Sequence, residues 1–318
     1  MPARPAFSVV VPCYNAGPYL ARAVRSTLSQ PGAGELEVII ADDVSTDGSL
    51  AEAKALAAAD PRIRVVRNAV NMGPGGTRNA AIAAATGEWI ALLDADDAFA
   101  EGRLARLAKI ARESGAQIVA DLPILYDLGA NVTAPTQLPT SGGWRLLAPT
   151  DLLNPDPVSG LDLGLLKPIF HHSLADSGLW KYADIRHGED FTLYLDLLVA
   201  GQRFALLHEA HYIFSARVGE VSGRFSPGSV TDVDYRAIAG SSRALAARYA
   251  GTAAGAEIAT LLGERADRAL AANRAYGWTV LRKREWKRLR RWLAADPANG
   301  PELARIALAK LGGHRGRV

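Results

Sequence analysis

The chain has 318 residues, of which 49% are hydrophobic and 22% are charged, with a formal net charge of +3 and a single cysteine. This composition excludes a disordered chain, and the length is enough for one large domain or two smaller ones. A lone cysteine excludes an intrachain disulfide and a thiolate-built zinc site, and it fits a reducing compartment.

Strand and helix patterns alternate over the first 120 residues. Four β-rich, apolar runs are each followed by a segment with helical character. Apolar strands separated by helices are typical of a parallel sheet covered on both faces. We therefore predict an α/β fold with a Rossmann-like, mostly parallel sheet and flanking helices. The expected strands lie in 7–15, 36–43, 63–70 and 88–97, and the expected helices in 16–30, 45–60 and 103–114. Residues 71–87 are expected to form a glycine-rich loop followed by an alanine-rich helix that ends at Gly87.

After Ala120 this alternation weakens. Residues 121–144 are rich in turn formers, which predicts a hairpin or a long loop. A further helix opens with Glu189 and Asp190 and ends near Gly201. The remainder is largely helical, so we predict three parts, 1–120, 121–218 and a basic helical region over 219–318.

Polar segments follow the four expected strands of the N-terminal part. In open α/β sheets, ligands bind in the crevice outside the carboxyl ends of the strands. We therefore expect a ligand site at this edge of the sheet, built from 12–15, 42–47, 71–79 and 94–97.

Three carboxylates, those of Asp94, Asp96 and Asp97, stand within four positions directly after an apolar run. Carboxylates so close together repel each other. A Mg²⁺ or Mn²⁺ ion, which prefers hard oxygen ligands and completes its shell with water and substrate phosphates, would relieve that repulsion. The alternative is a solvated turn in which Asp97 caps the next helix.

The glycine-rich segment "NMGPGGTRNAA" lacks the spacing of both the dinucleotide fingerprint and the Walker A loop. We place Arg78 in the first turn of a helix, where backbone N–H groups and the guanidinium together suit a diphosphate. The alternative is a flexible turn followed by a capped helix. Asp42 could accept a hydrogen bond from the N–H of a base such as uracil, or could belong to a capping turn.

These segments together resemble the nucleotide-sugar domain of family 2 glycosyltransferases, which have the GT-A fold. The resemblance extends over roughly two-thirds of the chain, in the order of the family. The combination of "GPGGTRN" with "LDADD" looks most like bacterial enzymes that build exopolysaccharide repeat units, of the succinoglycan glucosyltransferase kind. The matching segments are "SVVVPCYNAGPYLARAVRSTLSQ", "EVIIADDVSTDGS", "NMGPGGTRNAAIAAATGEWIALLDADD" and "GEDFTLYLDLLVAG".

The resemblance implies a UDP-sugar donor and a Mn²⁺ or Mg²⁺ cofactor. In the D-x-D motif, Asp94 would contact ribose and the metal shell, and Asp96 would coordinate the metal. Asp42 would bind the uracil edge, and Arg78 would contact the nucleotide or its phosphates. A third metal ligand stays unassigned. The implied donor-binding residues are Pro12, Tyr14, Asn15, Asp42, Asp43, Arg78, Asp94, Ala95, Asp96 and Arg217.

In "HGED", Asp190 matches the catalytic base of the family, with Glu189 as its neighbour. An acceptor hydroxyl is a poor nucleophile until a positioned base takes its proton, which supports a residue of this type. The alternative is a pair of ordinary acids in the first turn of a helix. The implied reaction is an inverting transfer of a hexose to a hydroxyl of a glycan or lipid-linked oligosaccharide.

Two rival functions can be weighed on the sequence. A sugar nucleotidyltransferase usually carries a glycine-rich strand and loop near its N-terminus, which "VVPCYNAGPYL" lacks. A catalytically silent sugar-nucleotide-binding or scaffold protein would not need the acids Asp94, Asp96 and Asp190.

From Leu261 to Val318 there are fourteen Lys/Arg and five Asp/Glu, and Trp278, Trp286 and Trp292 stand among the cations. Such a segment could lie on an anionic membrane surface, or could pack as an ordinary helix with solvated charges.

No apolar run approaches the roughly 18 residues that cross a bilayer, and the N-terminus lacks a signal-peptide pattern. We expect a cytoplasmic protein that is either free or peripheral on the inner face of the membrane. The basic residues lie outside the ligand crevice, which argues against nucleic acid as a partner.

Overall fold

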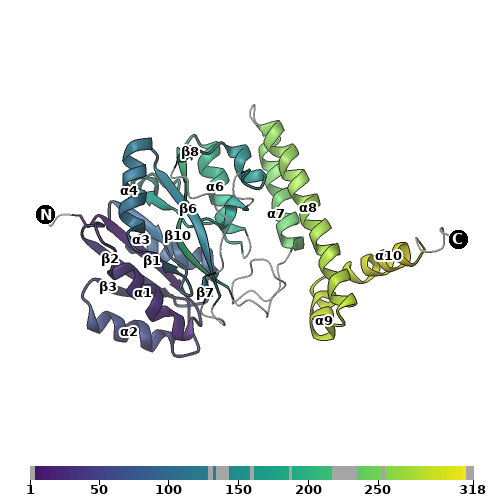
Figure 1. The fold of residues 1–318 in the computed structure, drawn as a ribbon, viewed down its shortest axis with the longest axis horizontal. Coiled ribbons are helices and arrows are strands. Elements are labelled where there is room, and N and C mark those ends of the chain that lie inside the picture. Colours follow the sequence, from purple (N-terminus) through teal and green to yellow (C-terminus); the bar gives the residue numbers. More distant parts are fainter. Residues whose placement is uncertain are drawn as a thin grey trace. The chain divides into compact units, whose positions relative to one another are not determined.

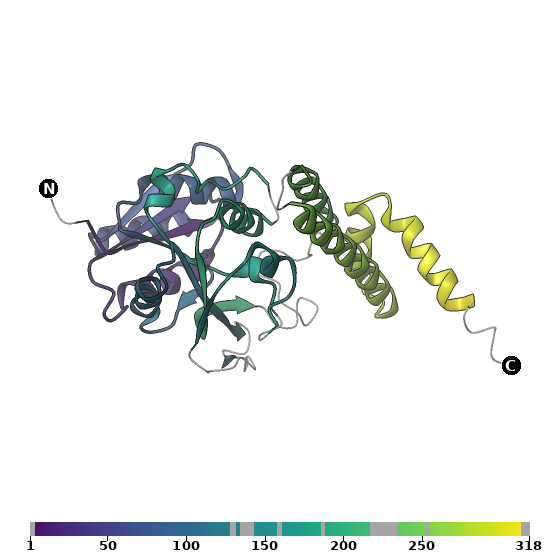
Figure 2. The ribbon, with the colours of Figure 1, turned by 90° about the horizontal axis from the view of Figure 1, so that it is seen from above.

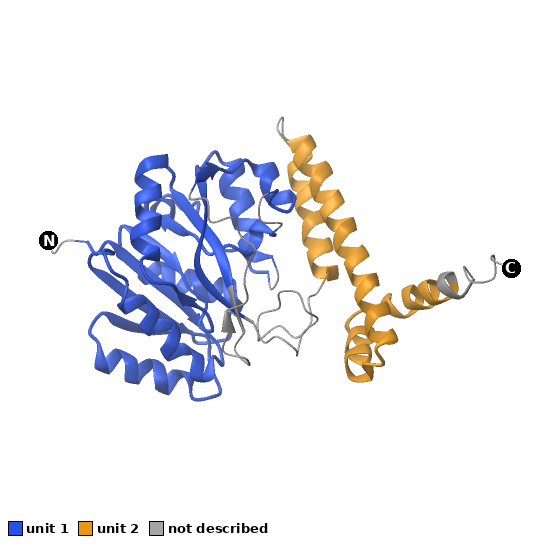
Figure 3. Ribbon diagram, viewed as in Figure 1, with its two compact units in different colours: residues 1–231 blue, residues 232–318 orange. Residues whose placement is uncertain are grey.

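The structure is a computed structural model, and it describes residues 4–127, 132–133, 143–157, 161–185, 188–216, 235–251 and 255–312. The chain forms two compact units, Met1–Thr231 and Asp232–Val318 (Figure 3). Each unit is described by itself below. The family resemblance implies that 1–120 is the half that binds the nucleotide sugar and that 121–218 is the half that binds the acceptor and carries the base, and this division stays a prediction.

A single twisted sheet forms the centre of the first unit (Figure 1). The strands predicted over the first 120 residues pair in parallel, with β1 between β2 and β4, and β3 beside β2. The predicted α/β fold with flanking helices is confirmed. These strands are β1 (Phe7–Cys13), β2 (Leu36–Asp42), β3 (Ile63–Arg67) and β4 (Trp89–Leu92).

Beyond β4 the sheet becomes mixed. Strand β9 (Ile169–His171) runs antiparallel to both β4 and β6 (Ile118–Asp127), whereas β10 (Phe204–Ala216) is parallel to β6. Three short strands pair antiparallel to their neighbours: β5 (Ala98–Phe99), β7 (Val132–Thr133) and β8 (Trp144–Leu146). Residues 121–127, expected in a turn-rich segment, are part of β6, because β10 pairs along them and β7 pairs with Tyr126 and Asp127.

The predicted helices of the first unit are present on both sides of the sheet (Figure 2). On one face of β1, Val9 and Val11 enter a core that also contains Leu20 and Leu104 from two of these helices. The helices are α1 (Leu20–Leu28), α2 (Ser49–Ala59), α3 (Gly73–Ala84), α4 (Arg103–Ser114), α5 (Ser173–Asp176) and α6 (Glu189–Val199), with the short 3-10 helices η1 (Gly17–Tyr19), η2 (Pro149–Leu153) and η3 (Leu163–Leu165).

The second unit consists of helices, as the sequence predicts. Helices α7 (Tyr235–Tyr249) and α8 (Gly255–Arg282) pack side by side (Figures 1 and 2), followed by α9 (Trp286–Ala295) and α10 (Asn299–Gly312). The indole N–H of Trp292 donates to Oδ1 of Asn273 at 2.9 Å, and both side chains are buried. Among the helices that the structure describes, none combines the length and the hydropathy needed to cross a membrane.

Candidate active site

Parallel pairing brings the carboxyl ends of β1 and β2 together, with Cys13 opposite Asp42. Directly beyond, Tyr14 is 54% exposed and Asn15 has a left-handed backbone, with φ of 50°. The Asn15 N–H donates to Oγ of Ser45 at 3.1 Å, and its Oδ1 accepts from the N–H of Thr46 at 2.8 Å. Asn15 therefore joins the ends of two strands, while Tyr14 presents its ring to solvent.

The neighbouring acids Asp42 and Asp43 are both buried. Oδ2 of Asp42 accepts from the N–H of Ser45 at 3.3 Å, and within the described part of the chain its Oδ1 has no hydrogen-bond partner. Asp43 instead uses both oxygens inside the fold, accepting from the N–H groups of Met72 at 2.8 Å and Gly73 at 2.9 Å. Asp43 therefore fixes the start of α3.

Helix α3 starts at Gly73, so the glycine-rich segment is helical rather than a loop. Arg78 consequently lies in the second turn, not the first, and its side chain is only 4% exposed. Its Nη2 donates to Oδ1 of Asp94 at 2.7 Å, and its Nη1 donates to Oε1 of Glu189 at 2.9 Å. Nη1 is also 3.4 Å from Oδ1 of Asp190. The predicted residues of three separate segments thus meet around one guanidinium.

A residue that sequence reasoning missed completes this cluster. Nζ of Lys167 lies 2.6 Å from Oδ2 of Asp190 and 3.1 Å from Oδ2 of Asp94, and its side chain is 7% exposed. The signal in the sequence is a lysine inside the apolar run "LGLLKPIF". A buried ammonium needs carboxylate partners, so such a lysine indicates acids nearby.

Mutual attraction favours the ionised forms of Asp94 and Lys167. Burial by itself would raise the pKa of Asp94, but Lys167 and Arg78 outweigh it and hold that pKa well below its usual range. Burial would likewise lower the pKa of Lys167, but Asp190 and Asp94 raise it above the ordinary value. The cluster of Arg78, Lys167, Asp94, Glu189 and Asp190, called here the charge cluster, contains two cations and three acids.

Asp96 lies next to the charge cluster but outside its ion pairs. Burial, together with the charge of Asp94, raises the pKa of Asp96 to about 6. Its backbone carbonyl accepts a hydrogen bond from the guanidinium of Arg22. Within the described ranges, no group of three or more His, Cys, Asp or Glu is arranged to hold a metal ion.

Asp97 does not cap the next helix, whose N-cap position is occupied by Gly102. Its carboxylate is buried, accepting from the hydroxyl of Tyr212 at 2.6 Å and from the N–H of Ser215 at 2.8 Å. Burial, followed by the charges of Asp96 and Asp94, raises the pKa of Asp97 well above its ordinary value. The interpretation of 94–97 as a solvated capping turn is therefore wrong.

Two further side chains, those of Trp180 and His211, have structural contacts. Trp180 is buried and stacks on Phe170 with a centroid distance of 4.1 Å, so it belongs to the core rather than to an open sugar-stacking surface. His211 lies with its Nδ1 3.6 Å from Oδ2 of Asp121. Arg217 lies outside the described residues.

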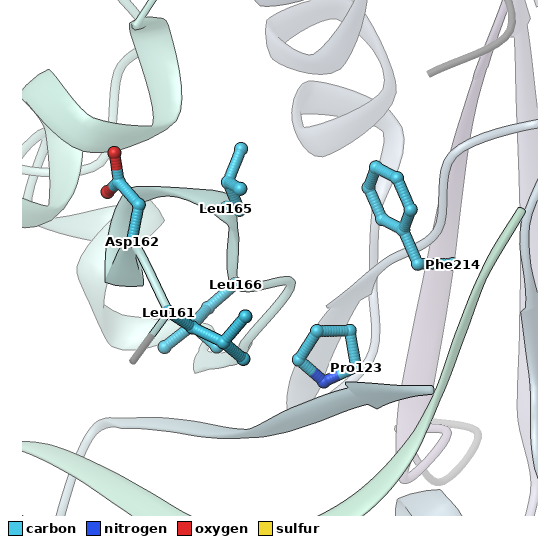
Figure 4. Close-up of a pocket in the computed structure, with 6 residues that line it drawn as sticks. All are labelled: Pro123, Leu161, Asp162, Leu165, Leu166 and Phe214. Carbon is cyan, nitrogen blue, oxygen red and sulfur yellow. The ribbon is translucent and has the colours of Figure 1, made fainter. Parts of the chain in front are cut away.

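A small apolar pocket lies near the charge cluster, but no side chain of the cluster lines it. Its one acid, Asp162, accepts a hydrogen bond from the N–H of Gly164 at 2.9 Å. The pocket therefore offers contact area but no reactive group. Its lining is drawn in Figure 4 and consists of Pro123, Leu161, Asp162, Leu165, Leu166 and Phe214.

Residues 8–169, which supply β1 to β4 and much of the charge cluster, match Glycosyl transferase family 2. The chain belongs to this family. This family 2 glycosyltransferase is 35% identical over 221 residues to the succinoglycan biosynthesis protein ExoO of Rhizobium meliloti, covering 69% of this chain and 63% of the relative. It is 33% identical over 227 residues to the protein ExoU of the same organism, with 68% and 63% covered. The chain thus spans less than two-thirds of these relatives.

Solved structures of other proteins have a fold similar to that of this chain. The crystal structure of residues 1–349 of S. aureus TarS in complex with UDP-GlcNAc superposes on this family 2 glycosyltransferase with a TM-score of 0.63 and 20% identity. That superposition covers 86% of this chain and 75% of the TarS chain. The complex of TarS with UDP gives a TM-score of 0.60. These neighbours confirm the predicted GT-A-like fold.

Proposed function

We propose that the protein is an inverting, metal-dependent glycosyltransferase that moves a hexose from a UDP-sugar to a hydroxyl of a glycan or lipid-linked oligosaccharide. The observation that carries this proposal is the meeting of Asp94, Arg78 and Asp190 in one charge cluster at the carboxyl edge of the sheet. The relatives named for succinoglycan biosynthesis support a role in bacterial exopolysaccharide synthesis.

The donor would lie across the ends of β1 and β2. The exposed ring of Tyr14 offers a face on which a base can stack. Oδ1 of Asp42, which lacks a partner within the described residues, is an acceptor for an N–H of uracil. Pro12 lies near the end of β1, and Asn15 lies directly beyond that end. The UDP and UDP-GlcNAc complexes of TarS, which shares this fold, support a uridine nucleotide as the ligand.

The residues of the D-x-D motif fit a divalent cation. Asp96 makes no ion pair with any residue that the structure describes, and burial together with the charge of Asp94 raises its pKa to about 6 despite the opposing charges of Lys167 and Arg22. Carboxylate oxygens are the ligands that Mg²⁺ and Mn²⁺ prefer. Asp96, together with Asp94, would hold the ion, and a bound ion would neutralise charge on the diphosphate.

Asp190 is the proposed base. Oδ2 of Asp190 accepts from Lys167 at 2.6 Å, whereas its Oδ1 has no hydrogen-bond partner in the described ranges. That second oxygen is the one available to take the proton of an acceptor hydroxyl as the new glycosidic bond forms. Attack on the anomeric carbon from the side opposite the leaving UDP inverts the configuration. Most of the rate gain would come from positioning and from charge stabilisation.

A direct test is UDP release from a panel of UDP-hexoses with Mn²⁺, with and without glycan acceptors, alongside calorimetric titration of UDP. We expect acceptor-stimulated release and Mn²⁺-enhanced UDP binding, both lost in Asp96→Asn. UDP binding without any release would instead favour the silent binding protein. Formation of UDP-sugar from UTP and sugar phosphate would favour the nucleotidyltransferase. UDP binding that is the same with and without Mn²⁺ would contradict the metal site.

We also propose that the protein works in the cytoplasm at the inner face of the membrane, through α9. One side of this helix is buried through Leu289 and Trp292, while Trp286 is 58% exposed. Lys287, Arg290 and Arg291 are exposed as well. An aromatic ring among exposed cations suits an anionic lipid surface.

Flotation with phosphatidylglycerol vesicles tests this membrane proposal in the full chain. Each surface cation contributes about 1 kcal/mol to such binding, so changing Lys287, Arg290 and Arg291 to glutamine should weaken it by on the order of 100-fold. Neutral phosphatidylcholine vesicles serve as the control. Equal flotation of the wild type and the triple variant would exclude this role of α9.

A further inference from the structure

We infer that Lys167 is a positioning residue that holds the proposed base Asp190 in place and ties it to Asp94 of the donor site. This inference rests on the proposed role of Asp190. The contact between Lys167 Nζ and Asp190 Oδ2, 2.6 Å long, is the shortest ion pair of the charge cluster. Nζ also reaches Oδ2 of Asp94 at 3.1 Å, so one ammonium bridges the two functional acids.

The backbone of Lys167 is itself fixed from the opposite side. Its carbonyl accepts a hydrogen bond of 2.5 Å from Nη2 of Arg103, whose side chain is fully buried. Arg103 pairs with Asp121 at 2.7 Å, and its guanidinium lies over the rings of Phe99, at 4.5 Å, and Tyr212, at 5.1 Å. A buried ion pair with aromatic contacts on the guanidinium leaves little freedom to move. The ammonium of Lys167 is thus held on a rigid support.

The two cations of the charge cluster divide its acids between them. Arg78 makes its short contact with Asp94, at 2.7 Å, and lies farther from Asp190, at 3.4 Å. Lys167 has the opposite preference, with 2.6 Å to Asp190 and 3.1 Å to Asp94. Without Lys167, Asp94 keeps its close contact with Arg78, but Asp190 loses its closest cation. We therefore expect loss of Lys167 to act on kcat more than on donor binding.

The test is the steady-state kinetics of Lys167→Ala and Lys167→Met, with Lys181→Ala as the control. Lys181 is an exposed lysine, whereas Lys167→Met keeps the buried aliphatic stem. A small displacement of a catalytic group can cost about 100-fold in rate. We expect kcat to fall about 100-fold in both Lys167 variants while KM for the donor changes less than about threefold. Lys181→Ala should match the wild type.

Chemical rescue separates positioning from general stability. Ethylammonium replaces the missing end of the side chain, so it should restore kcat of Lys167→Ala by about tenfold or more. It should leave the methionine variant unchanged, since that site is filled. Tetramethylammonium chloride at equal ionic strength should rescue neither variant, because it has no N–H to donate. Thermal unfolding and UDP titration accompany these assays.

Wild-type kcat in Lys167→Met would overturn the inference. So would a loss confined to donor KM, or a lower kcat in the alanine variant that ethylammonium does not restore. These failures differ from failure of the proposed function, in which the wild type itself releases no UDP. They also differ from failure of the base assignment, in which Asp190→Asn keeps its activity.

Discussion

The hydroxyl of Tyr212 donates a hydrogen bond of 2.6 Å to Oδ2 of Asp97, and both side chains are buried. The same hydroxyl oxygen accepts from the N–H of Asp94 at 3.2 Å. One tyrosine of β10 therefore holds the turn that carries Asp94 and Asp96. This arrangement explains why three acids follow β4 so closely, since the third is used inside the fold.

Tyr212→Phe removes both hydrogen bonds and leaves Asp97 with an unmet acceptor in a buried position. We expect the free energy of unfolding to fall by about 1–3 kcal/mol, as measured by urea denaturation. Mn²⁺-dependent UDP binding should weaken as well, because the turn is loosened. Tyr14→Phe, at an exposed position, is the control for stability and should unfold like the wild type. A Tyr212→Phe variant that is as stable as the wild type would contradict this interpretation.

Asp190→Asn keeps the size of the side chain but removes its basicity. General-base catalysis contributes about 10²–10⁴-fold in rate, so transfer should fall within that range. UDP binding, measured by calorimetry, should stay within a few-fold of the wild type. Asp184→Asn, which changes an exposed acid nearby in the sequence, should leave both quantities unchanged. Near-normal turnover of Asp190→Asn would mean that another group is the base.

Asp96→Asn should change the pH dependence of stability. The pKa of Asp96 is about 6 in the folded protein and about 3.9 in an unfolded chain. At a pH between these two pKa values, Asp96 is protonated in the folded protein but ionised in the unfolded chain. The free energy of unfolding therefore falls as pH rises through this range. The variant lacks this loss, and its stability relative to the wild type should increase from pH 4 to pH 7 by on the order of 2 kcal/mol. Urea denaturation without divalent cations measures the difference. Parallel profiles for the two proteins would show that Asp96 is not perturbed.

Two glycines of α8 offer a matched pair of substitutions in the second unit. A Cβ added at Gly277 would clash with the ring of Trp292, whereas one at Gly263 meets nothing within 4 Å. Gly277→Ala should therefore destabilise the unit by about 1–3 kcal/mol through overpacking. Gly263→Ala should stabilise it by roughly 0.5–1 kcal/mol, because alanine is the better helix former. Thermal unfolding measures both changes, and a shift in the same direction for both variants would contradict the packing of Trp292 on α8.

Local sequence patterns were enough to predict the N-terminal part of the fold. The strands β1 to β4 are apolar runs and their helices have amphipathic or alanine-rich sequences, both of which act within a few residues. Strand β6 was missed over 121–127 because its evidence is not local. The partner that runs along all of these residues is β10, which follows much later in the chain. The start of α3 was missed because the N–H groups of its first turn are satisfied by Asp43 rather than by a neighbouring cap.

In the candidate site, too, some features follow from local sequence patterns and others only from the tertiary structure. From the sequence by itself we predicted the segments that flank the strands, the acids Asp94 and Asp96 and the pair Glu189 and Asp190, because each is a short pattern at a predicted strand or helix end. Only the tertiary structure decided what those acids touch, since Arg78 and Glu189 are 111 positions apart in the chain. Lys167 shows the reason most clearly. A lysine in an apolar run can direct its ammonium to solvent or bury it, and here the acids Asp94 and Asp190, delivered by other elements, stabilise the buried charge.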